Sequence, residues 1–256
     1  MGQPILLLRL EGPLQSWGTR SRWDVRDTAP EPTKSGVLGL IGCALGLRRG
    51  DERFLQLDAG LRFGVRTECP GHKIIDFQTI TDFLPTAAGE FKGQGTRKKV
   101  LADLQSDPEA VPATIISPRA YLEDAAFLAA LEARPGASDL IHECALALRK
   151  PNWPLFLGRK ACVPTRPIFE ALTEEYADLE DALARHAWSW LGRNGQQRTR
   201  PRETQLEAWI EDGARDGTVR TATRQDVIRL NSARLYGFRQ ASLRICEPPT
   251  RQEAHS

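Results

Sequence analysis

The chain has 256 residues, of which 41% are hydrophobic and 27% are charged, so its composition is that of a globular protein and excludes wholesale disorder. Its net charge of +2 is close to zero and by itself indicates no class of partner. The longest apolar run, Val37 to Leu47, is too short to span a bilayer. The five cysteines are odd in number and widely spaced, and no basic stretch follows Met1, which together predict a reduced, cytoplasmic protein without disulfides, metal or other cofactors.

Two strands and a helix are predicted within the first 67 residues. Ile5 to Leu10 forms an apolar run that Gly12-Pro13 ends, and Leu61 to Thr67 alternates as a strand does. Thr33 or Ser35 is the expected N-cap of a helix over residues 36–47. Glycines recur every three or four residues along this helix, so they share one face, and we expect that face to lie close to a sheet. They are Gly36, Gly39, Gly42 and Gly46.

The composition changes over residues 72–117, which we expect to form an insertion that projects from the fold. Ile74 to Ile80 and Thr114 to Ile116 are candidates to pair as a β-hairpin. Between Pro85 and Val100 there are four basic residues and one acid, including the basic run Arg97-Lys98-Lys99. A long connection of this kind is unusual in a compact domain unless it serves binding.

The rest of the chain is predicted in five parts. Arg119 to Leu131 fits a helix or a strand equally well. Asp139 to Arg149 is predicted as an amphipathic helix, capped by Ser138 and stopped by Pro151. A short strand is expected in Pro154 to Cys162, and a helix in Asp178 to Trp190 that Gly192 ends. The segment from Gly213 to Ile245 holds seven arginines against two aspartates.

Basic and aromatic residues alternate between the first strand and the first helix. Trp17 and Trp23 with Arg20, Arg22 and Arg26 have the composition of a surface for single-stranded nucleic acid, where bases stack on rings and cations follow the backbone. Two buried tryptophans among solvated arginines would give the same pattern.

The helix start at Thr33-Lys34-Ser35-Gly36 is not a phosphate-binding P-loop, because that motif needs glycine at positions 28 and 33, where this chain has threonine. A helix N-terminus beside Lys34 still favours an anion.

Two further basic motifs lie later in the chain. Gly158-Arg159-Lys160 follows an apolar stretch and could bring the backbone close to a phosphate, although an ordinary exposed turn has the same pattern. Arg97-Lys98-Lys99 would suit phosphate at the tip of the insertion. Of the four histidines, only His72, next to Lys73 and with Tyr121 as a third member, suggests a metal-independent ribonuclease.

Four ordered blocks resemble a known family. The segments LLLRLEGPLQSWG, PTKSGVLGLIGCALG, RAYLEDAAFLAAL and KPNWPLFLGRKACVPTRPIF, between about Leu6 and Phe169, are similar to the Cas-five family of the RAMP superfamily, in the branch found in type I-E CRISPR Cascade. The C-terminal third matches more loosely, with Arg234-Leu-Tyr236 as its best anchor.

The resemblance implies an α+β fold with a modified ferredoxin-like or RRM-like (RAMP) core and a protruding β-hairpin thumb. It assigns the RAMP domain to residues 1–210, the thumb to about 72–117, and a smaller Arg-rich C-terminal extension to 211–256. It also makes Arg119 to Leu131 a strand.

The resemblance further implies a non-catalytic RNA-binding subunit of an antiviral surveillance complex that grips the 5′ handle of the CRISPR RNA. Its expected neighbours are the backbone subunit and the large PAM-reading subunit, and target DNA is reached through the complex. The RNA-binding residues expected from the resemblance and the basic motifs are Gln15, Ser16, Trp17, Gly18, Arg20, Arg22, Arg26, Lys34, Ser35, Lys98, Lys99, Arg119, Gly158, Arg159 and Lys160.

Two alternatives stay open. In the type I-C branch of the same family the protein cleaves precursor RNA with a Tyr, Lys and His set, for which this sequence has no convincing counterpart. An α/β protein whose basic loops contact only protein partners would also fit the residues.

Overall fold

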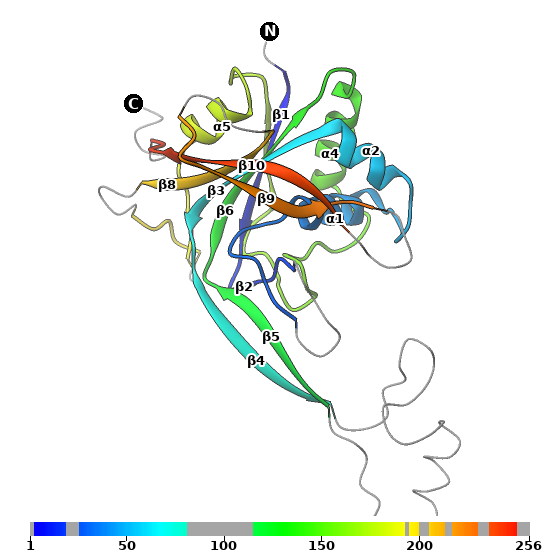
Figure 1. The fold of residues 1–256 in the computed structure, drawn as a ribbon, viewed down its shortest axis with the longest axis vertical. Coiled ribbons are helices and arrows are strands. Elements are labelled where there is room, and N and C mark those ends of the chain that lie inside the picture. Colours follow the sequence, from blue (N-terminus) through cyan, green and yellow to red (C-terminus); the bar gives the residue numbers. More distant parts are fainter. Residues whose placement is uncertain are drawn as a thin grey trace, which may run out of the picture.

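In the described part of the chain, residues 3–18, 26–80, 115–192, 195–199, 205–212, 217–229 and 236–249 of a computed structural model, one sheet of seven antiparallel strands forms the body (Figure 1). Its strands in spatial order are β7 (Phe169–Thr173), β1 (Ile5–Glu11), β6 (Ala126–Ala133), β3 (Leu61–Cys69), β8 (Leu206–Glu211), β10 (Gly237–Cys246) and β9 (Arg220–Val227). Along the chain, β1, β3, β6 and β7 are the first to fourth strands of this group. In the sheet they lie side by side in the order fourth, first, third, second.

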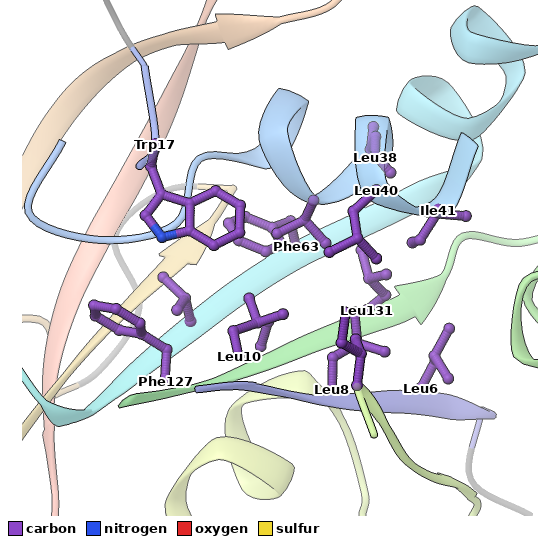
Figure 2. Close-up of a cluster of buried hydrophobic side chains, with 14 of the residues drawn as sticks. Leu6, Leu8, Leu10, Trp17, Leu38, Leu40, Ile41, Phe63, Phe127 and Leu131 are labelled. Carbon is purple, nitrogen blue, oxygen red and sulfur yellow. The ribbon is translucent and has the colours of Figure 1, made fainter. Parts of the chain in front are cut away.

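Helices cover both faces of this sheet. Helices α1 (Lys34–Leu45), α2 (Arg53–Gly60) and α4 (Ser138–Arg149) pack on one face, and α5 (Leu179–Arg185) packs on the other. The alternation of β1 explains the two layers: Leu6, Leu8 and Leu10 join the cluster under α1 and α4, whereas Ile5 and Leu7 join the cluster under α5. Figure 2 shows the first cluster, with side chains from α1 meeting those of the sheet.

The helix and both strands predicted in the first 67 residues are confirmed. Helix α1 has Thr33 as its N-cap, and the Thr33 hydroxyl accepts a hydrogen bond from the Gly36 N–H. The expected contact of its glycine face with a sheet is wrong. A Cβ on Gly36 would lie 2.9 Å from the Trp17 ring, and one on Gly42 would meet the ring of Phe54. These glycines therefore make room for aromatic rings.

A long hairpin leaves the body of the molecule, as expected for an insertion. Strands β4 (His72–Ile80) and β5 (Ile115–Glu123) pair antiparallel from His72–Glu123 to Ile80–Ile115, and the short β2 (Leu14–Gln15) pairs with β5 at the base. Figure 1 shows β4 and β5 extending well below the seven-stranded sheet.

The segment Arg119 to Leu131 is extended, as the resemblance implies, but it contributes to two strands. Strand β5 belongs to the hairpin sheet and β6 to the main sheet, and Asp124, with φ of 54°, lies in the turn between them. The segment therefore joins the projecting hairpin directly to the centre of the main sheet.

Three local predictions are wrong. No strand forms in Pro154 to Cys162, because Leu157 and Cys162 pair with each other in a tight loop (N···O 2.8 Å). Ser138 is the first residue of α4 and makes no cap. Helix α5 ends at Arg185 and not near Trp190, because Trp188 is drawn into the core and its indole N–H donates to the Glu68 carbonyl at 3.3 Å.

The Arg-rich C-terminal segment continues the main sheet. Strand β8 crosses the expected boundary between residues 210 and 211, and β10 pairs with it over six residues, from Cys246–Leu206 to Ala241–Glu211. Strand β9 then forms the edge. Across the parts of the chain described above, no helix has the length and apolar character needed to cross a membrane.

Candidate nucleic-acid interface

An open groove of about 770 Å³ lies beside helix α1. It is lined by α1, the segment after β2, the loop around Gly158, Gln225 of β9 and Tyr236, which precedes β10. Seven predicted site residues line it with side-chain or backbone atoms: Ser16, Trp17, Gly18, Arg26, Ser35, Gly158 and Arg159. The tertiary structure thus brings together residues that are up to 143 positions apart (Ser16 to Arg159).

The charged residues that line the groove are all positive. Three arginines, Arg26, Arg49 and Arg159, line it, and none of its described lining residues is an aspartate or a glutamate. The overall charge of the chain is only +2, so this imbalance is local. A cleft lined by positive charges without negative ones raises the local concentration of anions.

Gly158 lets the loop approach the groove segment very closely. It has φ of 99°, and a Cβ there would lie 1.8 Å from the Ser16 carbonyl oxygen. The Ser16 N–H donates to the Leu157 carbonyl at 3.0 Å, which holds the two segments together. Only glycine combines this backbone conformation with this contact.

Arg159 has a structural role as well as a place in the groove. Its guanidinium lies 4.7 Å from the centre of the Tyr121 ring and donates to the carbonyls of Ala120 (3.0 Å) and Arg26 (3.1 Å). These contacts tie the Gly158 loop to β5 and to the residue 26 segment. Arg119 pairs with Arg26 through an isolated bridge but does not line the groove.

Trp17 is a core residue. Its side chain is 1% exposed, and its indole N–H donates to the amide oxygen of the buried Gln15 at 3.0 Å. Figure 2 shows the ring in the same layer as Phe63 and Leu40. Of the two readings that the sequence allows for this ring, the structure shows packing against the core.

Lys34 is also buried, with 1% exposure, because its ammonium pairs with Glu211 at 2.9 Å and donates to the Asp58 carbonyl at 2.8 Å. The start of α1 already holds an anion: the Lys34 N–H donates to the carboxylate of Asp226 on β9 at 2.7 Å. The sequence-based expectation of an anion at this helix start is therefore satisfied from within the chain.

Other predicted site residues are placed differently. Lys160 is exposed next to the groove loop. Arg20, Arg22, Lys98 and Lys99 lie outside the described residues.

The side chains of the ribonuclease hypothesis do not come together. His72 and Lys73 are successive residues of β4 and point to opposite faces of the hairpin. Lys73 pairs with Asp27 at 2.7 Å, a contact that lowers the pKa of that carboxyl, and Tyr121 is buried with 3% exposure. Within the described ranges, no group of three or more His, Cys, Asp or Glu side chains could hold a metal ion.

The opposite face of the sheet holds a buried ionic network under α5. Arg9 and Arg66 both contact the Glu68 carboxylate, at 2.8 and 2.6 Å. Arg9 also lies 3.5 Å from Glu170, which in turn contacts His186 at 3.4 Å. Burial lowers the pKa of His186 and holds its ring neutral. These basic groups serve the core, not the groove.

Nine groove residues are outside the predicted RNA-binding set: Thr33, Gly36, Gly39, Leu40, Cys43, Arg49, Phe156, Gln225 and Tyr236. Tyr236 belongs to the best-matching fragment of the C-terminal third, which was its only signal. Phe156 and the residues of α1 lie inside segments that resemble the family, whereas Arg49 and Gln225 carry no local signal. Only the fold brings the residue after α1 and the residue of β9 to the same groove.

Comparisons with known proteins identify the family of the chain. A family model described as "CRISPR-associated protein (Cas_Cas5)" matches residues 5–240. The "CRISPR system Cascade subunit CasD" of Escherichia coli (strain K12) is 35% identical over 165 residues, which are 64% of this chain and 69% of that protein.

Two solved structures are similar over nearly their whole length. A chain of a "CRISPR RNA-guided surveillance complex" has a TM-score of 0.67 at 30% identity and covers 98% of this chain and 96% of its own. A "Crystal structure of Cas protein" has a TM-score of 0.64 at 32% identity, with 96% and 98% covered. The chain belongs to the Cas5 family of CRISPR-associated proteins.

Proposed function

We propose that this chain is the CasD-type subunit of a Cascade surveillance complex and that it binds the 5′ handle of the CRISPR RNA in the groove beside α1. The observation that carries the proposal is the groove itself, which is lined by three arginines and by no described carboxylate. The relatives support it, since one is a Cascade subunit by name and another is part of an RNA-guided complex.

The topology supports the finer assignment of a RAMP core. The order β1, α1, β3, β6, α4, β7 along the chain and the spatial order β7-β1-β6-β3 are those of a ferredoxin-like βαββαβ unit. The projecting β4–β5 hairpin then corresponds to the thumb. Residues 1–210 form the RAMP domain in this proposal, and the Arg-rich segment 211–256 extends its sheet.

RNA contacts divide into two kinds in this groove. Arg26, Arg49 and Arg159 offer guanidinium groups to phosphates, and Gly158 allows close approach of backbone. Lys160, Arg20, Arg22, Arg119, Lys98 and Lys99 stay proposed phosphate contacts. Gln15, Trp17 and Lys34 act indirectly, because each is buried and holds the groove segments in place.

The hairpin offers a surface for a neighbouring subunit. Ile75, Phe77 and Ile116 are 55%, 67% and 60% exposed, and they lie on one face because Phe77 pairs with Pro118 and Thr79 with Ile116. Large apolar side chains exposed together mark a protein interface. We assign this face to contact with the backbone or large subunit of the complex.

The proposed role is non-catalytic and cytoplasmic. Lys73 lies on the opposite face of the hairpin from His72 and Tyr121, and Tyr121 is buried, so the three side chains do not form one site for an endoribonuclease. Incubating the full chain with repeat RNA in EDTA tests this, and cleavage that disappears in His72→Ala would overturn it.

Reversing one groove charge tests the binding proposal. Arg49→Glu is compared with Arg48→Glu, because both side chains are exposed and adjacent but only Arg49 lines the groove. We expect Arg49→Glu to weaken binding of repeat RNA and to make its dependence on salt shallower, by about 0.7 in the slope of log K against log salt for each lost contact. Equal effects of the two variants would contradict the proposed site.

A further inference from the structure

The C-terminal part of the chain also lines the groove. Gln225 of β9 and Tyr236, just before β10, both line it, although the expected RNA-binding surface contained no residue after Lys160. The Tyr236 side chain is 39% exposed. The side-chain nitrogen of Gln225 lies 3.5 Å from the Tyr236 carbonyl oxygen, so the two residues are neighbours across the β9–β10 pair.

A second partly exposed ring lines the same groove and comes from the middle of the chain. Phe156 lies at the start of the loop that holds Gly158 and Arg159, and it is half-buried. Unlike Trp17, which is 1% exposed, Phe156 and Tyr236 keep part of their surface open. The groove therefore combines accessible aromatic surface with the three arginines described above.

The helix side of the groove is bare at Gly39. A Cβ at this position would meet no atom within 4 Å, whereas Cβ atoms at Gly36 and Gly42 would collide with aromatic rings. Gly39 is thus not required by packing, and it lines the groove with backbone only. A side chain of any size at Gly39 would occupy space that is open now.

We propose that the groove holds one unstacked base of the bound RNA against Tyr236, with Phe156 and the bare helix surface at Gly39 completing the subsite. The proposal rests on the RNA-binding function proposed above and names the residues that contact a base. Aromatic side chains take up bases of single-stranded RNA by stacking on their faces, and arginines nearby neutralise the flanking phosphates. Phosphate contacts alone would need neither ring.

The test is a double-mutant cycle that combines one change in the protein with one change in the RNA. The full-length chain and its Tyr236→Ala variant are titrated with fluorescein-labelled repeat RNA, first intact and then with a single abasic residue at each position in turn. We expect Tyr236→Ala to weaken binding of intact RNA about 5- to 150-fold, which corresponds to the loss of one base–aromatic stack of about 1–3 kcal/mol. At one RNA position the abasic change should lower the affinity of the wild-type protein but should not lower the affinity of the variant any further.

Two controls separate stacking from general damage. Tyr236→Phe keeps the ring and should bind as the wild type does. Phe238→Ala removes an aromatic side chain that is 68% exposed, lies on β10 and does not line the groove, so it should leave RNA binding unchanged. If Tyr236→Ala shows the same abasic penalties as the wild type at every position, Tyr236 contacts no base and the inference is wrong.

Gly39→Leu provides a second variant that cannot fail by unfolding the helix. Leucine favours a helix over glycine, so the Tm should stay equal or rise while the added side chain fills the groove and weakens RNA binding at least tenfold. Unchanged binding by Gly39→Leu would overturn the placement of the base. If the wild-type chain shows no salt-dependent RNA binding, the proposed function is wrong. If the wild type binds RNA and the variants bind equally well, only the placement of the base is wrong.

Discussion

The close contact between Gly158 and Ser16 gives a sharp test of how the groove is built. In Gly158→Ala, the new Cβ would lie 1.8 Å from the Ser16 carbonyl oxygen, and alanine would have to adopt φ of 99°. A non-glycine residue in such a backbone region costs about 1–3 kcal/mol. Moving the loop away to relieve the clash would also break the Ser16 N–H to Leu157 carbonyl bond of 3.0 Å, worth about 1 kcal/mol.

We therefore expect Gly158→Ala to lower the free energy of unfolding by about 2–4 kcal/mol, a large share of the roughly 5–15 kcal/mol of a typical domain. Urea unfolding followed by tryptophan fluorescence measures the loss. RNA affinity should fall as well, because the Gly158 loop carries Arg159 into the groove.

Gly50→Ala is the matched control. Gly50 has φ of 85°, but a Cβ there would meet no atom within 4 Å, so this variant carries the backbone cost of about 1–2 kcal/mol without the collision. If Gly158→Ala destabilises the protein no more than Gly50→Ala and binds RNA normally, the close approach of the loop to Ser16 is not needed and the reasoning is refuted.

Four further outcomes are expected. Lys34→Met should lower the free energy of unfolding by about 3–5 kcal/mol in urea titrations, because it leaves the buried Glu211 carboxylate with only the more distant Arg134, at 3.5 Å. Lys160→Ala should leave unfolding unchanged and make the salt slope of RNA binding shallower by about 0.7 in fluorescence titrations. Phe77→Asp should leave the fold intact, since the side chain is 67% exposed, but reduce co-purification with the other subunits. Burial lowers the pKa of His186 below 6.5, so the stability contributed by the neutral ring is present above pH 6.5 and lost as the pH falls below it, and urea midpoints of His186→Gln should depend less on pH between 7.5 and 5.5.

Each outcome has a control or a contrary result. Lys34→Met combined with Glu211→Gln should recover part of the lost stability, and no recovery would argue against the ion pair as the cause. An unchanged salt slope would remove Lys160 from the RNA contacts. Gln78→Asp lies on the opposite face of the hairpin from Phe77 and should assemble normally. Equal pH dependence of the wild type and His186→Gln would show that other groups dominate.

Local signals in the sequence determined the elements that form the centre of the fold. The apolar run of β1, the Thr33 cap of α1 and the alternation of β3 each depend on neighbours within a few residues, so their residue types were sufficient to predict them. The family resemblance made Arg119 to Leu131 extended, where periodicity left helix and strand equal. The sequence predicts a strand where the structure has the tight loop around Gly158, because a run of three apolar residues occurs in short strands and in buried loops alike.

Part of the candidate site could also be predicted from the sequence. Glycine and arginine at positions 158 and 159 follow one another in the chain, and Arg26 lies in a visibly basic segment, so these groove residues had a local signal. Trp17 and Lys34 had the same kind of signal, yet both side chains are buried. Composition cannot separate these cases, because a tryptophan or a lysine is exposed or buried according to what packs on it.

Only the tertiary structure decided which cations face the groove and which serve the core. Lys34 is buried because β8 places Glu211 against it, and the start of α1 holds the Asp226 carboxylate because β9 lies beside it. Tyr236 reaches the groove for the same reason, through strands that join the sheet some 200 residues after Trp17. The sequence by itself determined the central elements and the chemistry available to them, whereas long-range strand pairing selected the partner of each charge and ring.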